Sequence, residues 1–448
     1  MIKLHKTPVA VALLAGLVAI PAHAKLTSEE AARLGKDLTP LGGEMAGNKE
    51  GTIPKYTGGL TTPPACFKPG VEYCDPFSGD KPKFTITPAN VGQYKDQLPA
   101  GALAMFQKYS TFKMPVYETR RTAAVPRDIA ETVKKEATQI ELDGFGLTKR
   151  VNSTTPFPIP KNGLEAIWNH ILRYMGGGLV RSQVAVPVRA NGQYYLTITE
   201  EQRIFNQNMD KPQENRLLNF KQRILEPASL AGTVLLVHEP VEQAKEARSA
   251  WVYNTGQRRV KRAPDVAYDG VADGTEGLRF HDQYDAYNGA PDRYDWKLVG
   301  KKEMYIPYNA YKVGEKSHKF DEILTKNHAN PDLMRYELHR VWVVEATLKA
   351  GQRHNFSKRV FLLDEDSWNV VWEDAYDGRG DLWRVQMHGV VQFYDALTTS
   401  ARYNSYHDLN NGTYLMMGLD NDRKGTLQFN QKGKMADFMP DALRREGQ

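Results

Sequence analysis

The densest group of acidic side chains is Asp364-Glu365-Asp366, which directly follows an apolar stretch. Carboxylates this close repel one another, which raises a pKa or attracts a cation. A calcium loop fits poorly, because Trp368 holds the fifth position and no glutamate stands at the twelfth. Turn chemistry explains the cluster better, although a carboxylate pair across a cleft would also serve a hydrolase.

The histidines show no spacing typical of a metal site. Among the eleven histidines, His170, His238, His281, His339 and His354 are scattered along the chain. The sequence also lacks a Gly-x-Ser-x-Gly elbow, a His-Glu-x-x-His helix and a Walker A loop. We therefore predict no catalytic residue, no metal and no cofactor, and expect a protein that is not an enzyme.

The strongest basic cluster is Arg258-Arg259-Val260-Lys261-Arg262. Arg258, Arg259, Lys261 and Arg262 are candidates for docking an acidic partner or anionic lipid headgroups. A solvated strand face with Val260 pointing inward explains the same alternation. Both interpretations stay open.

Cys66 and Cys74 are the only cysteines, and they lie in a stretch rich in proline and glycine. We expect a disulfide between them in an oxidising compartment. The short loop that it closes would stabilise the fold by roughly 2–3 kcal/mol.

The first 24 residues read as a signal peptide. Lys3 and Lys6 form its positive end, an apolar run follows from Val9 to Ile20, and Ala22-His23-Ala24 is a cleavage site. Removing these two lysines lowers the formal charge from +6 to +4. Such a weak charge gives no indication of nucleic-acid binding. We expect a periplasmic protein without a lipid anchor.

After the signal peptide, residues 25–150 are expected to form an extended and helical segment that packs on the main domain, 151–448. Frequent glycine and proline interrupt this segment. Helices are expected at 93–109, 126–143 and 163–174. The second has apolar residues at three- and four-residue spacing.

The remainder is predicted to be mainly β, an α+β fold built on a curved antiparallel sheet. The hairpin signal Asn191-Gly192 is the strongest turn. Strands are expected at 179–190, 194–200, 233–238, 250–253, 258–263, 297–306, 334–348, 358–363, 369–377, 382–394 and 413–418.

The strand at 334–348 has apolar residues on both faces, so both faces are expected to be covered, one of them by a helix. A groove between sheet and helix is a place for an apolar ligand, and a plain core explains the pattern equally well. The candidate groove residues are Trp251, Tyr253, Tyr305, Trp342, Val344 and Leu348.

Several segments together resemble a family of secreted Gram-negative proteins of unknown function, often labelled outer membrane lipoprotein-sorting proteins. The clearest runs from Arg248 to Pro264, and others are 293–309, 336–346, 38–48, 156–161 and 364–368. The resemblance implies a LolA/LolB-like fold, an incomplete β-barrel with packing helices and a hydrophobic cavity. It also implies an RND-type (MMPL-like) exporter and an outer-membrane β-barrel protein as partners.

We therefore expect a periplasmic carrier that binds a lipid-like or other hydrophobic small molecule and catalyses no reaction. Two alternatives are an envelope hydrolase that uses the carboxylates Asp364, Glu365 or Asp366, and an assembly or adaptor protein. The first 150 residues have no counterpart in the smallest lipoprotein carriers, so a segment of the chain itself could fill part of the cavity.

Overall fold

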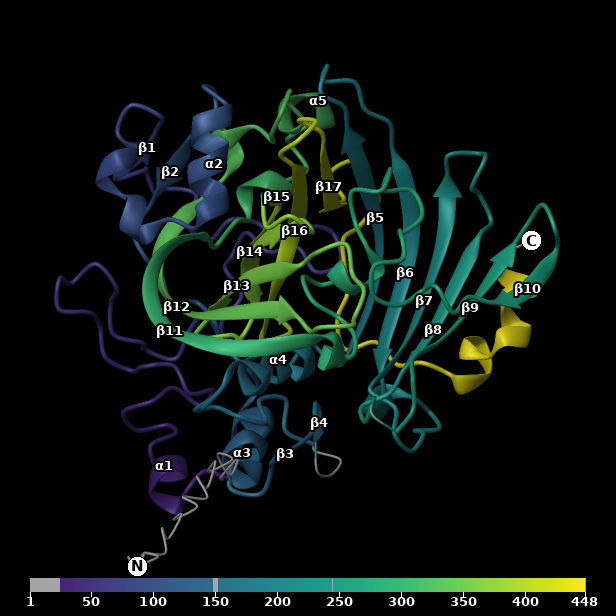
Figure 1. Cartoon of the computed structure of the whole chain (residues 1–448), viewed down its shortest axis with the longest axis horizontal. Helices are drawn as coiled ribbons and strands as arrows, with labels where there is room; N and C mark the ends of the chain where they lie inside the picture. Colours follow the sequence, from purple (N-terminus) through teal and green to yellow (C-terminus); the bar gives the residue numbers. More distant parts are fainter. Residues whose placement is uncertain (1–24, 148–151, 244, 448) are drawn as a thin grey trace, which may run out of the picture.

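The structure, a computed structural model, describes residues 25–147, 152–243 and 245–447 (Figure 1). The predicted signal peptide lies outside the described residues. Fifteen strands form one sheet, which is antiparallel except for a single bridge between Tyr336 and Val116. Among the described residues, no helix is long and apolar enough to cross a membrane.

The sheet runs in the order β1-β2-β12-β13-β14-β15-β16-β17-β5-β6-β7-β8-β9-β10, and β11 pairs with β12. Its strands are β1 (Phe84–Ile86), β2 (Met114–Val116), β5 (Gly178–Val188), β6 (Thr197–Phe205), β7 (Leu218–Glu226), β8 (Val234–Glu239), β9 (Ser249–Asn254), β10 (Arg259–Arg262), β11 (Tyr294–Pro307), β12 (Tyr336–Leu348), β13 (Lys358–Asp364), β14 (Val370–Tyr376), β15 (Leu382–Phe393), β16 (Thr398–Asp408) and β17 (Tyr414–Leu419). A small second sheet pairs β3 (Leu142–Asp143) with β4 (Gly146–Leu147).

The α-helices are short and lie around the sheet. They are α1 (Ser28–Ala32), α2 (Ala100–Lys108), α3 (Arg127–Glu136), α4 (Gly163–Leu172), α5 (Phe320–Ile323) and α6 (Leu443–Glu446). The predicted fold is confirmed: the protein is mainly β, and its large antiparallel sheet curls without closing into a barrel (Figure 1). Within the described residues, β1 and β10 are the two ends of the strand order and do not pair with each other.

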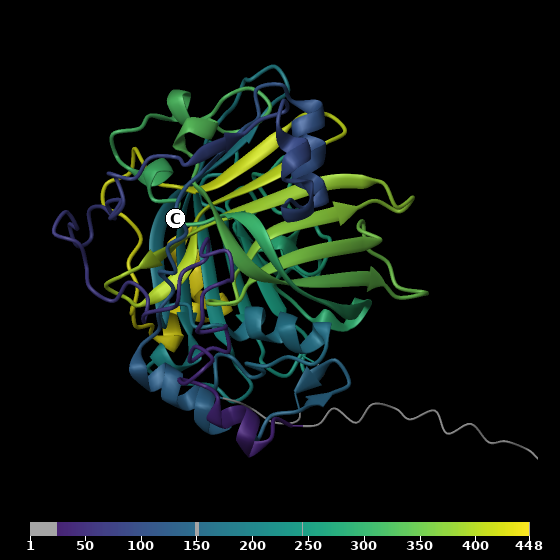
Figure 2. The ribbon, with the colours of Figure 1, turned by 90° about the vertical axis from the view of Figure 1, so that its left-hand side faces the viewer.

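Helices cover both faces of the curled part of the sheet, with α2 on one side and α4 on the other (Figure 2). We call these the α2 face and the α4 face. Val341 and Val343 of β12 belong to the core on the α2 face, whereas Val344 and Ala346 pack with α4. The alternation of side chains along a strand explains how one strand serves two cores.

Helix α4 approaches β11 very closely. Its first residue is Gly163, where an added Cβ would lie 2.8 Å from the backbone of Trp296 and Lys297. Asn162 caps the helix, because its side chain accepts a hydrogen bond from the backbone N–H of Glu165 at 2.9 Å. Only glycine permits this approach, which seals the α4 face over β11 and β12.

Beyond β13 an irregular segment replaces the helix as the cover of the α4 face. We call residues 263–290 the cover segment; within it the structure has one 3-10 turn, His281–Gln283. Leu278 packs with Ala185 and Met417, and the Tyr406 hydroxyl donates to the backbone carbonyl of Gln283 at 3.1 Å. The cover segment is therefore anchored across the central strands.

Two strands were not predicted from the sequence, β7 and β16, and neither were the short edge strands β1 and β2. The predicted helix at 126–143 ends earlier, with α3, because 142–143 turn back to pair with 146–147. The predicted helix at 93–109 begins only at Ala100. Pro99 stands before it, where its fixed φ and missing N–H interrupt a longer helix.

Residues 39–121 are tied to the sheet by a buried ion-pair cluster at the turn 364–366. Arg121 donates two hydrogen bonds to Asp366, at 2.8 and 2.6 Å, and both side chains are almost fully buried. Arg340 and Lys301 donate to Glu365 at 2.8 and 2.9 Å. Although burial acts in the opposite direction, the charge of Asp366 raises the pKa of Arg121.

We predict that Arg121→Met lowers the free energy of unfolding by about 3–5 kcal/mol, because it leaves Asp366 buried without its cation. Urea unfolding followed by circular dichroism measures the loss. The matched control is Arg33→Met, which removes an exposed pair with Asp37 and should cost about 1 kcal/mol or less. A loss at Arg121 no larger than the control's would contradict the role of this cluster.

Candidate functional site

Two adjoining cavities lie on the α4 face beneath the cover segment. Strands β5 and β16 contribute more residues than any other element to the first, which we call the polar cavity, and β7 and β8 contribute nearly half of the second, the apolar cavity. The cavities share Arg279, Tyr284 and Met417 in their walls. Their free volumes are about 30 and 40 Å³, which is room for roughly two to four water molecules each.

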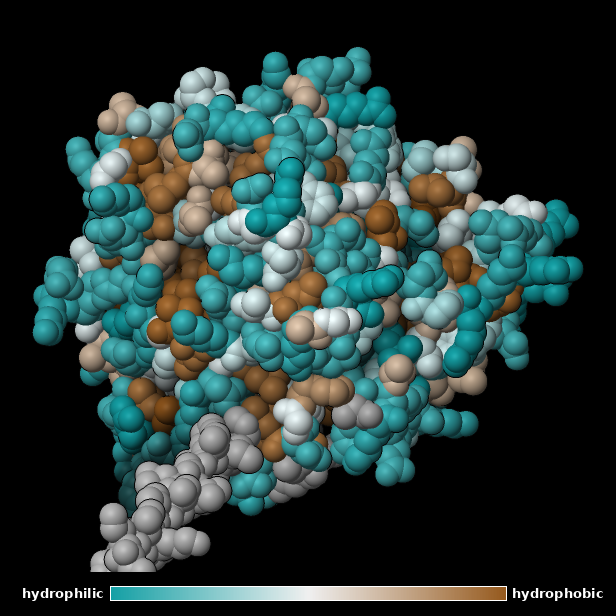
Figure 3. All heavy atoms as spheres, in the orientation of Figure 1, coloured by the Kyte–Doolittle hydropathy of each residue, from teal (hydrophilic) through white to brown (hydrophobic). Residues whose placement is uncertain are grey.

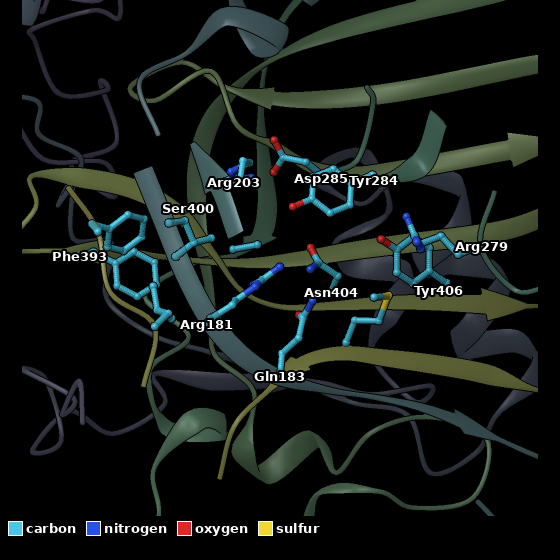
Figure 4. A pocket seen from close by; sticks show the side chains of 15 residues that line it. Arg181, Gln183, Arg203, Arg279, Tyr284, Asp285, Phe393, Ser400, Asn404 and Tyr406 are labelled. Atoms are coloured by element: carbon cyan, nitrogen blue, oxygen red, sulfur yellow. The ribbon is translucent and has the colours of Figure 1, made fainter. Parts of the chain in front are cut away.

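Strand register explains why these side chains meet. Arg181 is paired with Glu201, and Arg203 with Phe220, so all four point to the same face. Figure 4 shows Arg181 and Gln183 extending from β5 toward Asn404 of β16. The lining of the polar cavity is Leu179, Arg181, Gln183, Arg203, Arg279, Tyr284, Asp285, Phe393, Ser400, Ala401, Asn404, Tyr406, Met417, Leu427 and Phe429.

Glu201 is fully buried, and its carboxylate accepts hydrogen bonds from three side chains. It accepts from Arg181 at 3.0 Å, from Gln183 at 2.7 Å and from the Tyr284 hydroxyl at 2.6 Å. Burial and the charge of Glu201 raise the pKa of Tyr284. The tyrosine therefore stays protonated and joins the cover segment to β6.

Asp285 is the other carboxylate at the polar cavity, and it is also engaged in an ion pair within the protein. It accepts from Arg173 at 2.6 Å. Burial acts to raise its pKa, but the charges of Arg173 and Arg203 outweigh burial and lower it to about 2. Asp285 is therefore ionised at neutral pH and paired with a residue behind the cavity wall.

Arg203 and Arg279 are buried, at 4% and 7% exposure. Within the described part of the chain, neither guanidinium has a carboxylate within 4.0 Å, and the Nε of each is buried without a hydrogen-bond partner. Arg279 lies 5.8 Å from the centre of the Tyr284 ring. Gln183 and His388 on the same face also have a buried polar atom without a partner.

The apolar cavity has an apolar floor of four side chains from β7 and β8, and its remaining wall mixes apolar with polar residues. The wall consists of Leu218, Phe220, Gln222, Leu235, Val237, Glu239, Arg248, Val266, Arg279, His281, Tyr284, Asn288 and Met417. Glu239 accepts from Arg248 at 2.6 Å, so this pair is neutral overall. Burial and the charges of Arg279 and Arg248 lower the pKa of His281 to about 3, which keeps its imidazole neutral.

A third cavity, of about 200 Å³, lies on the other side of an apolar cluster that borders the apolar cavity. Met175, Phe205 and Leu217 line it, and Met175 and Phe205 pack with Phe220 and Val237 of the apolar cavity. Methionine side chains adapt their shape easily. This cluster is therefore a deformable wall between the small cavities and a larger space.

The six predicted groove residues lie elsewhere. Val344 is fully buried under α4, with Trp342 and Leu348 half-buried beside it. Tyr305 belongs to the core on the α2 face, Tyr253 packs among residues near the C-terminus, and Trp251 lies edge-on against His238. None of the six lines the polar or the apolar cavity.

Figure 3 shows apolar side chains gathered over the curve of β11 and β12 and beside α2, while hydrophilic residues cover most of the remaining face. Val299 of β11 is 45% exposed. Trp296, Leu298, Trp342 and Leu348 are only half-buried there. The groove role of Trp342 and Leu348 stays a prediction.

Strand β10 carries the basic cluster at an edge of the sheet. Arg259, Lys261 and Arg262 are exposed, and Arg258 lies just before the strand. Charged side chains on an edge strand hinder unwanted pairing with other sheets. The docking role of these four residues stays a prediction.

Cys66 and Cys74 are joined by a disulfide.

Asp364 is the last residue of β13, and Glu365 and Asp366 begin the predicted turn, but all three are buried and not solvated. Burial and the charge of Asp366 raise the pKa of Asp364. His339, Asp364 and Asp366 each place one possible ligand atom within 4.8 Å of the others. Arg121 occupies both oxygens of Asp366, so the charges are already compensated by arginine.

Arg181, Gln183, Leu235 and Val237 lie on predicted strands, but the cavities were missed from the sequence because β7, β16 and the cover segment were missed. The sequences of β7 and β16, Leu-Asn-Phe-Lys-Gln-Arg-Ile-Leu-Glu and Thr-Thr-Ser-Ala-Arg-Tyr-Asn-Ser-Tyr-His-Asp, carry polar residues toward both faces. The missed signal was spacing: β16 closely follows the predicted strand 382–394, and β7 closely precedes the predicted strand 233–238, as in two hairpins.

The sheet is open, curled and antiparallel, with a helix across one face. The chain itself belongs to the family described as protein of unknown function DUF1329, whose model matches residues 85–444. The family recognised in the sequence is thereby confirmed.

Uncharacterized protein PA3922 of Pseudomonas aeruginosa is 48% identical over 453 residues, covering 100% of this chain and 98% of that protein. A candidate outer membrane lipoprotein-sorting protein domain from Vibrio parahaemolyticus matches 63% of this chain and 98% of its own, with a TM-score of 0.45 and 15% identity. A DUF1329 family protein from Desulfovibrio piger matches 60% and 92%, with a TM-score of 0.42 and 13% identity.

We predict that His281 makes the folded protein less stable in acid. The unfolded chain protonates this residue near pH 6.5 and the folded protein only near pH 3, so stability is lost as pH falls below 6.5. Relative to His281→Gln, the wild type should lose about 2 kcal/mol between pH 8 and pH 5. Urea unfolding of both proteins at the two pH values measures this; parallel pH profiles would contradict it.

Arg203 and Arg181 form a matched pair on the same face, one without a carboxylate partner and one with Glu201. We predict that Arg203→Met leaves the free energy of unfolding unchanged or raises it, because it removes an uncompensated buried charge. Arg181→Met should lower it by about 3 kcal/mol, since Glu201 then loses its cation. Equal losses in urea unfolding would show that Arg203 is compensated after all.

Proposed function

We propose that this protein is a periplasmic carrier that binds one hydrophobic molecule between the sheet and the cover segment, without catalysing a reaction. The observation that carries the proposal is the apolar cavity, built from Leu218, Phe220, Leu235 and Val237 on two adjacent strands and roofed by Val266. A concave, mostly apolar space with a few polar groups is the usual form of a small-molecule site. The resemblance of the DUF1329 family to LolA-like carriers supports the same function.

The cavities are too small for a lipid chain in this conformation, so binding requires the cover segment to move. Its backbone favours such movement, because four of its non-glycine residues have positive φ: Tyr268, Glu276, Asp285 and Ala286. Left-handed backbone costs about 1–2 kcal/mol per residue. Release of this strain would offset part of the cost of opening.

The larger cavity beside Met175 offers room for the rest of a long ligand. Displacement of the Met175 and Phe205 side chains would join it to the apolar cavity. We infer that a ligand enters from this side and reaches the space above β7 and β8.

The family resemblance also points to partners for such a carrier, an RND-type inner-membrane exporter and an outer-membrane β-barrel protein. The exposed cations of β10 are the surface we propose for docking one of them. The hydrolase alternative gains no support, because Arg121, Arg340 and Lys301 already engage the buried carboxylates of Glu365 and Asp366.

We predict saturable binding of an apolar fluorescent probe, N-phenylnaphthylamine, and its displacement by long-chain amphiphiles. Val237→Phe should weaken binding roughly ten-fold or more, because the larger ring fills the apolar cavity. The control is Val299→Phe on the exposed part of β11, far from the cavity wall in sequence and absent from its lining. No saturable binding, or equal binding by Val237→Phe and the wild type, would contradict the proposal.

A further inference from the structure

The polar cavity carries more buried positive charge than the protein neutralises. Three guanidinium groups line it, from Arg181, Arg203 and Arg279, and a fourth, from Arg173, lies behind its wall. The carboxylates are two, Asp285 in the lining and Glu201 beside it. Asp285 is paired with Arg173 and Glu201 with Arg181. Arg203 and Arg279 are left without a carboxylate within 4.0 Å among the described residues.

A buried lysine can avoid the free-energy cost of an unpaired charge by losing its proton, but a buried arginine keeps its proton and its charge. An isolated buried charge is strongly unfavourable unless it is paired and hydrogen-bonded. Other buried arginines of this protein obey that rule: Arg359 is paired with Asp282 and Glu373, and Arg402 with Asp420. Arg203 and Arg279, which lack a paired carboxylate, both line the polar cavity.

The two arginines reach the cavity from different elements, Arg203 from β6 and Arg279 from the cover segment. A ligand group held between them would therefore join the sheet to its cover. Guanidinium presents paired N–H donors that match the oxygens of carboxylate and phosphate groups. Neutral donors and acceptors stand beside them on Gln183, Ser400 and Asn404.

We propose that the ligand is an anionic amphiphile, whose carboxylate or phosphate head is bound by Arg203 and Arg279 and whose apolar tail lies in the apolar cavity over β7 and β8. This rests on the proposed function and specifies its ligand class. The shared wall of Arg279, Tyr284 and Met417 places the two ends of such a molecule side by side. Binding of the head neutralises the excess charge and holds the cover segment down.

The test compares C14 amphiphiles that share a tail: myristate, 1-myristoyl lysophosphatidate, 1-monomyristin and tetradecylamine. Each competes with N-phenylnaphthylamine on the full chain, below its critical micelle concentration. One or both anionic compounds should bind at least about ten-fold more tightly than monomyristin, and the amine most weakly. The anionic compound that binds more tightly identifies the head group.

The variant Arg203→Met/Arg279→Met should lose this preference to within about two- to three-fold while still binding monomyristin and the probe. Arg203→Lys/Arg279→Lys keeps both charges and should retain most of the preference, which separates a charge effect from altered packing. Equal affinity for myristate, lysophosphatidate and monomyristin in the wild type would overturn the anionic head. So would a preference that survives the methionine variant.

These outcomes separate the two proposals. If neither the probe nor any amphiphile binds, the carrier function itself fails. If monomyristin binds as tightly as the anions, the carrier function stands and only the ligand class is wrong.

Discussion

The fold depends on covering both faces of a large sheet with few helices. On the α2 face, apolar residues from β1, β2 and α2 complete an apolar core. On the α4 face, α4 packs mainly on β11 and β12 and reaches Val370 of β14 through His170, and the irregular cover segment covers the strands beyond. An irregular cover leaves polar atoms and small cavities where a helix would leave neither, and this difference produces the site.

Two neighbouring regions, which Arg173 connects through its hydrogen bonds to Asn369 and Asp285, differ in how buried charge is compensated. At the turn 364–366, three cations and the neighbouring carboxylates compensate one another, and the N-terminal segment is held to the sheet by that balance. At the polar cavity, Arg203 and Arg279 lack such partners, and positive φ at Asp285 and Ala286 strains the cover nearby. The paired charges stabilise the folded protein at the turn, whereas the unpaired charges and strained backbone destabilise it at the cavity. Such local destabilisation is common where a protein binds a ligand.

The sequence predicts the fold well where one physical signal dominates. The long strands β11 and β12, the Asn191-Gly192 hairpin and helix α4 follow from alternation, turn chemistry and helical spacing. It fails at β7 and β16, because polar residues point toward both faces of these strands and interrupt the apolar alternation that marks a strand. It also fails at the cover segment, whose position is set by long-range contacts such as Tyr284 with Glu201.

The acidic cluster and the groove residues show the same limit. Asp364-Glu365-Asp366 is visible in the sequence, but its burial depends on Arg121, more than 240 residues away. The aromatic residues of β9, β11 and β12 are equally suited to a core or to a groove, and burial places Tyr253 and Val344 in the core. Spacing identifies strands, whereas the choice between a core and a cavity depends on what packs against them.

The most direct test of this account is native mass spectrometry, with organic extraction, of the protein recovered from the periplasm of a Gram-negative host without detergent. The account predicts one additional mass per chain, which extracts into organic solvent and carries a carboxylate or phosphate group. Recovery of the chain without a bound molecule, or with a neutral one, would contradict it.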